Sequence, residues 1–226
     1  MEPVMTNDKW FDTTDDAVLC RGGENGSMTV TQIMPLVKFV KDYETFLDVG
    51  CGSGTTIDAL LALKKAICYK GVDFIGHRIE WLKEKYLPYT FGMGLKPDTT
   101  FEVEDARYLR EKDKSWDTVW SRHVIDHVDS FEKTMDEHCR VAKKRVICIL
   151  WYALTDADEH RITHVTYDGI VYKDEYLNQY SKSKIKTYLD DKCSNGWKVS
   201  EYLKEVSWQG DRKGKGEDTI IVLERV

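Results

Sequence analysis

Three glycines and a carboxylate in the stretch 47–55 are the residues most suited to a chemical role. The stretch reads Leu-Asp-Val-Gly-Cys-Gly-Ser-Gly-Thr. Glycine adopts backbone angles that are closed to other residues, and its lack of a Cβ lets the main chain approach a ligand closely. The amides of such a turn, with the first N–H groups of a following helix, are expected to form an electropositive rim. The pattern is typical of a nucleotide-like cofactor site, and a glycine-rich turn without a ligand is the alternative.

A strand and a helix must position this turn. Residues 46–49 form a short apolar run that stops at the glycines. Residues 55–65 then place Ile57, Leu60 and Leu61 on one helical face. The segment is therefore expected to fold as a strand, a tight turn and a helix.

The spacing of the glycines separates two classes of cofactor. A dinucleotide fingerprint requires G-x-G-x-x-G, and the position of its third glycine is Thr55 here. Asp48 stands two residues before the first glycine. Its carboxylate would repel a pyrophosphate but would hold an ammonium group, directly or through water. A nicotinamide-dependent dehydrogenase is therefore the weaker hypothesis.

A second carboxylate, Asp73, ends the apolar run that begins at Ala66. It lies about 20 residues beyond the glycines, where a carboxylate at a strand end accepts both hydroxyl groups of a ribose. Several nucleoside cofactors need such an acceptor, so Asp73 indicates a nucleoside without choosing among them.

The whole string 47–55 resembles motif I of the class I S-adenosylmethionine-dependent methyltransferases, in which this turn cradles the amino acid end of the cofactor. The resemblance covers residues 28–151 motif by motif, and the remainder only by strand pattern. It implies an α/β, Rossmann-like, doubly wound sheet of seven strands, mostly parallel, with strand order 3-2-1-4-5-7-6 and a C-terminal antiparallel hairpin. It also implies S-adenosylmethionine as cofactor and S-adenosylhomocysteine as product.

Further motifs carry the resemblance along the chain. Residues 104–107 follow an expected strand at 100–103 and resemble the segment in which an aspartate accepts a hydrogen bond from the adenine amino group, a role that falls to Asp105. The expected strand 116–121 ends beside the transferring methyl group in the family. The turn 140–144 resembles the family's basic turn before the fifth strand but lacks its usual Pro-Gly. The residues expected at the cofactor are Asp48, Val49, Gly50, Cys51, Gly52, Ser53, Gly54, Thr55, Asp73, Phe74, Asp105, Ala106, Arg107, Ser121 and Arg122.

Histidines are the candidates for acid–base chemistry. Methyl transfer from a sulfonium requires an aligned nucleophile, and a general base helps when the acceptor is a hydroxyl or a protonated amine. His127, in a His-Val pair that is common at this place in the family, is the first candidate, followed by His123 and His164. The i, i+4 spacing of two histidine pairs also suits a metal, but neither pair has an H-E-x-x-H pattern or a third ligand, and no metal site is predicted.

The chain is expected to form a single domain, because 226 residues are too few for two comfortable α/β domains. Residues 1–27 are expected to form an N-terminal arm, which is either an ordered loop or a cover over the cofactor. Residues 28–151 form the cofactor-binding core, 152–196 the substrate-specificity region and 197–226 the final hairpin. The residues expected at the substrate are Tyr176, Asn178 and Tyr180, with simple core packing as the alternative.

Composition limits the partners. The formal charge of −6 argues against a large nucleic-acid footprint. The six cysteines show no C-x-x-C pair, and the N-terminus shows no secretory signal. The longest apolar stretch, 146–154, is too short to span a membrane. A soluble, cytoplasmic enzyme is therefore expected.

The function expected from these observations is methyl transfer to an oxygen or nitrogen acceptor on a small molecule. An RNA or protein methyltransferase is the first alternative, and a non-catalytic module that binds S-adenosylmethionine is the second. A basic face that gathers Lys64, Lys65, Lys70 and the lysines of 182–192 would favour the first alternative. The oligomeric state is left open.

Overall fold

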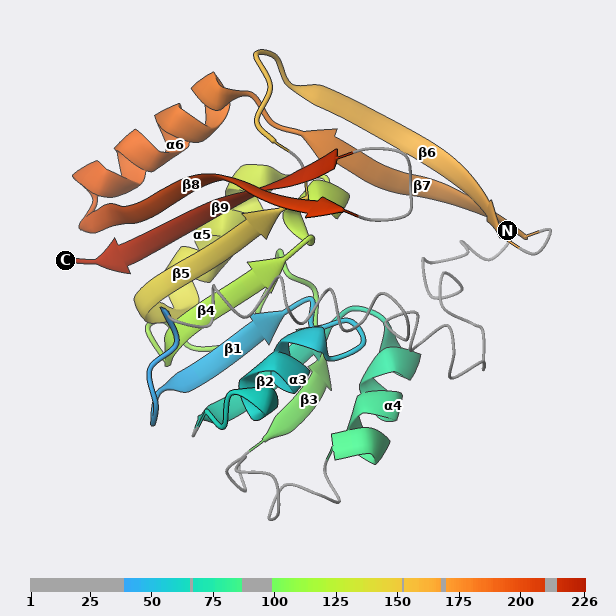
Figure 1. Ribbon diagram of the computed structural model, residues 1–226, viewed down its shortest axis with the longest axis vertical. Coiled ribbons are helices and arrows are strands. Elements are labelled where there is room, and N and C mark those ends of the chain that lie inside the picture. Colours follow the sequence, from blue (N-terminus) through green and yellow to red (C-terminus); the bar gives the residue numbers. More distant parts are fainter. Residues whose placement is uncertain (1–38, 66, 87–98, 152, 168–169, 210–214) are drawn as a thin grey trace.

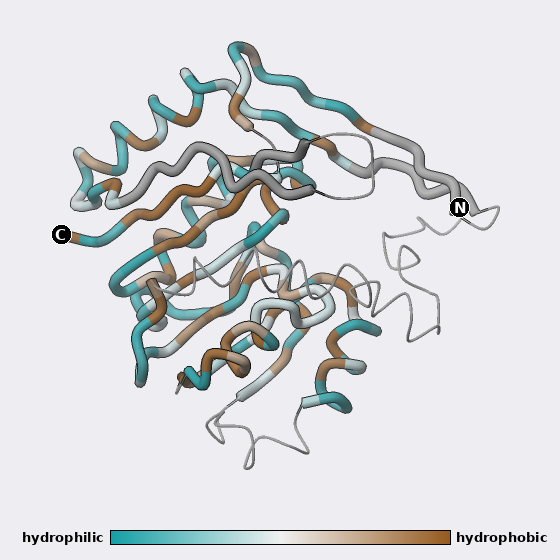
Figure 2. Tube along the Cα trace, viewed as in Figure 1, coloured by the Kyte–Doolittle hydropathy of each residue, from teal (hydrophilic) through white to brown (hydrophobic). Residues whose placement is uncertain are grey.

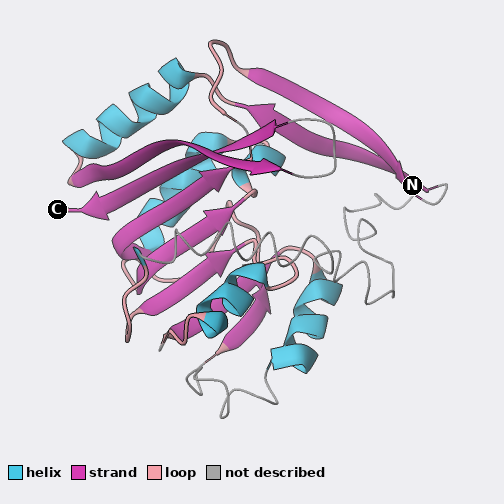
Figure 3. Ribbon diagram, in the orientation of Figure 1, coloured by secondary structure: helices cyan, strands magenta, loops and turns pink. Residues whose placement is uncertain are grey.

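A sheet of seven strands forms the centre of the molecule, and helices lie on both of its faces (Figure 1, Figure 3). The computed structural model describes residues 39–65, 67–86, 99–151, 153–167, 170–209 and 215–226. The expected N-terminal arm 1–27 lies outside these residues. The strands of the main sheet are β1 (Thr45–Val49), β2 (Cys68–Asp73), β3 (Thr100–Val103), β4 (Trp116–Arg122), β5 (Ala142–Leu150), β8 (Trp197–Gln209) and β9 (Lys215–Arg225).

The strands follow the order β3-β2-β1-β4-β5-β9-β8. The first five in chain order pair in parallel, with β1 between β2 and β4. The last two are antiparallel, since β9 runs against both β5 and β8. This arrangement confirms the expected Rossmann-like class and its strand order, in which β8 and β9 are the sixth and seventh strands of the sheet.

Alternating side chains along the strands build two hydrophobic cores. Phe46, Tyr69 and Trp120 belong to the core covered by α3 (Thr55–Ala62) and α4 (Gly76–Tyr86). Leu47 and Val119 belong to the opposite core, which α5 (Phe131–Val141) and α6 (Lys182–Ser194) cover. Strands buried on both faces read as nearly continuous apolar runs, and Figure 2 shows such runs along β5 and β9.

Serine and aspartate favour helix N-caps, so the sequence predicts one cap at Asp129 or Ser130 and another at Ser181. The structure places the caps at Ser130 and Ser181. Ser130 Oγ accepts a hydrogen bond from the N–H of Lys133 at 3.3 Å, and Ser181 Oγ accepts one from Lys184 at 3.1 Å. The helix expected over 55–65 is shorter, because it ends at Ala62 and Lys64 adopts a left-handed φ of 53° that no α-helix continues.

The region 152–196 contains a hairpin that the sequence pattern does not predict. β6 (Glu159–Tyr167) and β7 (Ile170–Gln179) pair antiparallel in a separate two-stranded sheet. Figure 1 shows this hairpin crossing above the main sheet and projecting past it. β7 contacts η4, a 3-10 turn at Ile125–His127 that follows β4. The hairpin is therefore placed next to the loop that carries the expected base.

The apolar pattern predicts a fifth strand over 145–151 and two final strands over 197–206 and 219–226. All three strands are longer in the structure: β8 and β9 remain paired as far as Gln209 and Lys215, and β5 begins at Ala142 rather than Arg145. None of the helices in the described ranges is long and apolar enough to cross a membrane.

His138 provides a test of the α5 core. Its side chain is fully buried, and burial lowers the pKa of the imidazole to about 4, against an unfolded value near 6.5. The unfolded chain therefore binds the extra proton first, so this group lowers the free energy of unfolding as the pH falls from about 6.5. The loss reaches on the order of 3 kcal/mol below about pH 4.

Replacing His138→Leu is expected to remove this part of the acid sensitivity. The measurement is urea denaturation from pH 7 to pH 4, with the exposed His77→Leu in α4 as control. If the free energy of unfolding of His138→Leu falls between pH 7 and pH 4 by as much as that of the parent, the buried imidazole is not the source of the acid sensitivity.

Candidate functional site

A cavity of about 450 Å³ is lined by the segments that follow the parallel strands. Gly50 follows β1, Asp73 ends β2, Glu104 follows β3, His123 follows β4 and Trp151 follows β5. From β1 the sheet continues to β2 and β3 on one side, and from β4 it continues to β5 on the other side. The boundary between β1 and β4 is therefore the point at which the strand order reverses. Open α/β sheets bind ligands in the crevice outside the carboxyl ends of their strands at this point.

The glycine turn has left-handed backbone angles, with φ of 71° at Gly50 and 54° at Gly52. Its amides do not form the free electropositive rim that the sequence suggests. The N–H groups of Gly50 and Cys51 donate to the carbonyl oxygen of Val72, at 2.7 and 3.0 Å. That of Gly52 donates to Asp73 Oδ2 at 2.9 Å. The end of β2 thus satisfies these donors, and the turn offers a ligand close approach rather than hydrogen bonds from these amides.

The carboxylate of Asp73 accepts hydrogen bonds from the backbones of two turns. Its Oδ2 accepts from Gly52, and its Oδ1 accepts from the N–H of Ile75 at 2.9 Å. Arg78 Nη1 lies 3.7 Å from Oδ2 and adds a positive charge. A carboxylate has about four acceptor positions, so two remain for a ligand after the two amides are bound. This capacity fits a pair of ribose hydroxyl groups.

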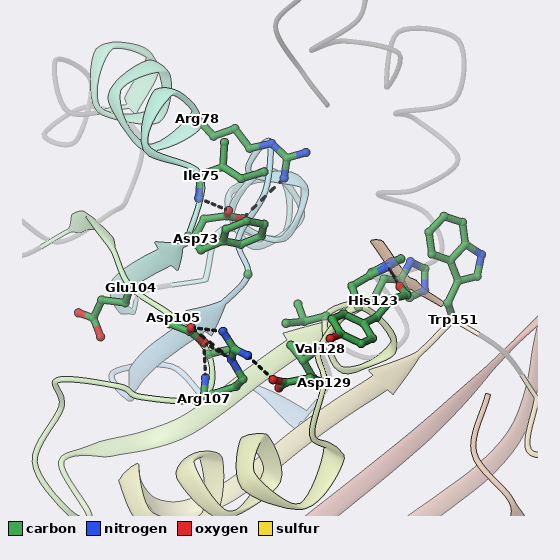
Figure 4. Close-up of a pocket in the computed structure, with 16 residues that line it drawn as sticks. Asp73, Ile75, Arg78, Glu104, Asp105, Arg107, His123, Val128, Asp129 and Trp151 are labelled. Carbon is green, nitrogen blue, oxygen red and sulfur yellow. Dashed lines mark hydrogen bonds and ion pairs between the residues drawn. The ribbon is translucent and has the colours of Figure 1, made fainter. Parts of the chain in front are cut away.

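Asp105 and Arg107 form a second polar group on the same side of the cavity (Figure 4). Arg107 Nη2 lies 2.6 Å from Asp105 Oδ2, and Arg107 Nη1 lies 2.8 Å from Asp129 Oδ2. The hydrogen bond from Arg107 lowers the pKa of Asp105, which therefore stays ionised and acts as an acceptor.

The opposite side of the cavity is aromatic. The rings of His123 and Trp151 stack at 5.2 Å between centroids and 17° between planes, and the His127 ring meets Trp151 edge-on at 5.6 Å. His127 Nδ1 lies 3.0 Å from the carbonyl oxygen of Tyr176, which orients that ring. Burial lowers the pKa of both histidines, so both imidazoles are neutral near pH 7.

Comparison with known proteins agrees with this geometry. A family described as a methyltransferase domain matches residues 47–150. A SAM-dependent methyltransferase from Methanosarcina mazei has a TM-score of 0.64 at 13% identity, covering 85% of this chain and 97% of that one. The magnesium protoporphyrin IX methyltransferase of Synechocystis PCC 6803, solved with bound SAM, has a TM-score of 0.62 at 16% identity and full coverage of both chains.

The sequence match to the methyltransferase-domain family thus covers residues 47–150, and the solved methyltransferase structures share the fold of the chain. Among curated relatives, ajmaline N-methyltransferase of Rauvolfia serpentina is 29% identical over 135 residues, which is 57% of this chain and 45% of the relative. The chain spans between 33% and 45% of the length of three curated relatives that it matches.

Several residues expected at the cofactor of this methyltransferase domain line the cavity. They are Gly50, Asp73, Phe74, Asp105, Ala106 and Arg107. The others belong to the turn and the strand ends behind them, outside the described lining: Asp48, Val49, Cys51, Gly52, Ser53, Gly54, Thr55, Ser121 and Arg122.

Asp48 lies in the interior rather than at the cavity wall. It is 1% exposed, and its Oδ2 accepts a hydrogen bond from the Tyr69 hydroxyl at 2.7 Å. Burial raises the pKa of its carboxyl to about 7, so much of it is protonated near neutral pH. A direct ion pair between Asp48 and an ammonium group does not match this environment.

The residues expected at the substrate divide into two groups. Tyr176 lines the cavity. Asn178 and Tyr180 are buried, where Asn178 Nδ2 donates to the carbonyl of Val128 and the Tyr180 hydroxyl donates to that of Ile125, both at 2.7 Å. These two hydrogen bonds join the end of β7 and the residue after it to η4 and the residue that follows η4. His164 lies in β6, and its side chain is outside the described part.

The sequence did not indicate several of the residues that line the cavity. They are Ile75, Arg78, Glu104, Val124, Val128, Asp129 and Trp151. The available signal was positional, because each follows or faces the end of a parallel strand. Asp129 read as a helix cap and Trp151 as the end of a buried strand, and neither pattern by itself indicates a ligand.

The glycine turn generates a prediction about folding. A Cβ at Gly50 would lie 2.2 Å from Val124 Cγ2, whereas one at Gly52 would meet nothing nearer than Arg78 Nη1 at 3.7 Å. Both substitutions to alanine carry the left-handed strain of about 1–2 kcal/mol, and Gly50→Ala adds about 1–3 kcal/mol of overpacking. Urea denaturation should therefore place Gly50→Ala below Gly52→Ala in stability. Adding Val124→Ala should reduce the difference in free energy of unfolding between the two glycine variants. Equal stabilities of the two single variants would contradict the predicted steric overlap.

Proposed function

We propose that this chain transfers a methyl group from S-adenosylmethionine to an oxygen or nitrogen atom of a small molecule. The observation that carries the proposal is one cavity that joins acceptors suited to a nucleoside, Asp73 and Asp105, to neutral imidazoles at the ends of β4 and η4. When bound, S-adenosylmethionine supplies the methyl carbon and its sulfur leaving group.

The residues present fit this cofactor. Asp73 has two acceptor positions left for ribose hydroxyl groups, and Asp105 is an ionised acceptor for the adenine amino group. Phe74 is 50% exposed and presents an aromatic surface to the cavity. The chain's own task is then to hold the acceptor in line and to exclude water.

The distribution of charge supports a small acceptor over RNA. Lys70 is buried, and its Nζ lies within 3.0 Å of carboxylates from Glu102, Glu104 and Glu111. The lysines of α6 are likewise paired with acids: Lys182 with Asp156, Lys184 with Glu132, Lys186 with Asp190 and Lys192 with Asp136. The basic face that RNA binding would require is therefore largely neutralised. The N-methyltransferase relative from Rauvolfia serpentina also favours a small acceptor.

Calorimetric titration with S-adenosylmethionine, S-adenosylhomocysteine and NAD tests the cofactor. The first two are expected to bind and NAD is expected to give no heat. Asp73→Asn should weaken S-adenosylmethionine binding roughly 10- to 100-fold, because each hydrogen bond to a charged group is worth about 1.5–3 kcal/mol. Asp190→Asn removes an exposed carboxylate on α6 and serves as the charge-matched control.

Because Asp73 also braces the glycine turn, the stability of each variant must be measured beside its affinity. A folded Asp73→Asn protein that binds as tightly as the parent would reject the ribose assignment. Binding of NAD alone would reject the proposed cofactor.

A further inference from the structure

His123 has a backbone conformation that is unusual for a residue with a side chain. Its φ is 54°, in the left-handed region, and its N–H donates to the carbonyl of Ile149 at 2.9 Å. Such a conformation costs about 1–3 kcal/mol and persists when the surroundings determine it, most often at functional sites. This strain indicates that the position of the His123 imidazole serves a function.

The strand register brings a carboxylate to His123 from the other end of the chain. Arg122 of β4 pairs with Ile149 of β5, and Leu150 pairs with Thr219 of β9. The next residue on each side is then His123 and Asp218. Asp218 Oδ2 lies 3.1 Å from His123 Nε2, and Asp218 is 5% exposed.

The face of the imidazole is fixed as well. The indole of Trp151 stacks on His123, and the backbone N–H of Trp151 donates to Asp126 Oδ2 at 3.0 Å. Asp126 is 1% exposed and lies in η4, directly below the cavity loop. One edge of the His123 ring thus faces a carboxylate and one face stacks on the Trp151 indole, while His123 lines the cavity (Figure 4).

We propose that His123 is the catalytic base of this protein and that Asp218 is its positioning residue, so that the acceptor is a hydroxyl compound that must lose a proton. This inference rests on the proposed function. It concerns the choice among the histidines and the chemical class of the acceptor.

The acceptor oxygen uses a lone pair to form the new bond to the methyl carbon, while the carbon–sulfur bond breaks and its electron pair stays on sulfur. The acceptor's proton passes to Nδ1 of His123, since Nε2 faces Asp218. The carboxylate then stabilises the imidazolium cation that forms, as a carboxylate does beside any catalytic histidine.

The carboxylate also distinguishes His123 from His127. His127 Nδ1 lies 3.0 Å from a carbonyl oxygen, that of Tyr176, and a protonated His123 nearby disfavours a second positive charge on His127. His127 is thus equipped to orient Trp151 and Tyr176, whereas His123 is equipped to hold a proton.

The pH dependence follows from the charged groups that face His123. Burial lowers its pKa most, Asp218 from β9 opposes that effect, and Arg122 at the end of β4 reinforces it. Asp126 and His127 of η4 complete the surroundings. The base is therefore unprotonated at neutral pH, and turnover is expected to fall on the acid side. Removing the charge of Asp218 should lower the pKa of His123 further and move this acid limb to lower pH.

The test compares three folded variants of the full chain. His123→Asn suits the left-handed backbone, because asparagine tolerates a positive φ. Asp218→Asn removes only the charge, and His127→Asn is the matched control on the neighbouring imidazole. Turnover is followed as release of S-adenosylhomocysteine from S-adenosylmethionine with a panel of phenols, carboxylic acids and primary amines.

We expect His123→Asn to lower kcat for a neutral hydroxyl acceptor at least about 100-fold, with the KM for S-adenosylmethionine within about twofold of the parent. We expect para-nitrophenol, which ionises unaided at alkaline pH, to be much less affected. Asp218→Asn should lower kcat and shift the acid limb downward. A loss in His127→Asn that equals the loss in His123→Asn, or an acid limb that Asp218→Asn does not move, would overturn the proposal.

Two further readouts keep the inference separate from the proposed function. If the parent does not bind S-adenosylmethionine, the proposed function itself fails. If it binds but methylates nothing in the panel, NMR titration of the imidazoles with S-adenosylhomocysteine bound decides. The pairing is overturned if Asp218→Asn does not change the pKa of His123, or changes it no more than the pKa of His127.

Discussion

The parallel pairing of β1 with β2 on one side and with β4 on the other is the constraint on which the structure depends. It sets the carboxyl ends of five strands along one edge and separates the chain into two directions of winding. The glycine turn, the Asp73 brace and the His123 loop each occupy one of these ends. Without that pairing, groups from distant parts of the sequence would not share a cavity.

Local signals predicted much of this arrangement. The glycines required a turn with left-handed angles, the apolar runs required buried strands, and Ser130 and Ser181 marked helix starts. Asp73 was identified because its distance from the turn is fixed by one helix and one strand. The expected rim of free amides was wrong, since the distance along the sequence does not show that the end of β2 binds those N–H groups.

What the sequence did not predict depends on pairing between distant segments. The β6–β7 hairpin is rich in polar residues, so the apolar alternation of its sequence is weak. Asp218 lies in the first part of β9 and carries no motif, and only the register of β9 on β5 places it beside His123. Asn178 and Tyr180 read as substrate contacts because they are polar and aromatic, but their hydrogen bonds to backbone carbonyls place them in the interior.

The charges around the cavity have a consequence for selectivity between ligands. The described lining carries four carboxylates, Asp73, Glu104, Asp105 and Asp129, against two guanidinium groups, Arg78 and Arg107. Each of these carboxylates lies near a cation: Asp73 lies near Arg78, Asp105 and Asp129 both contact Arg107, and Glu104 contacts Lys70 from outside the lining. The carboxylates are therefore held in place as hydrogen-bond acceptors while much of their charge is compensated. The wall thus selects a ligand by the positions of its hydrogen-bond donors more than by its net charge.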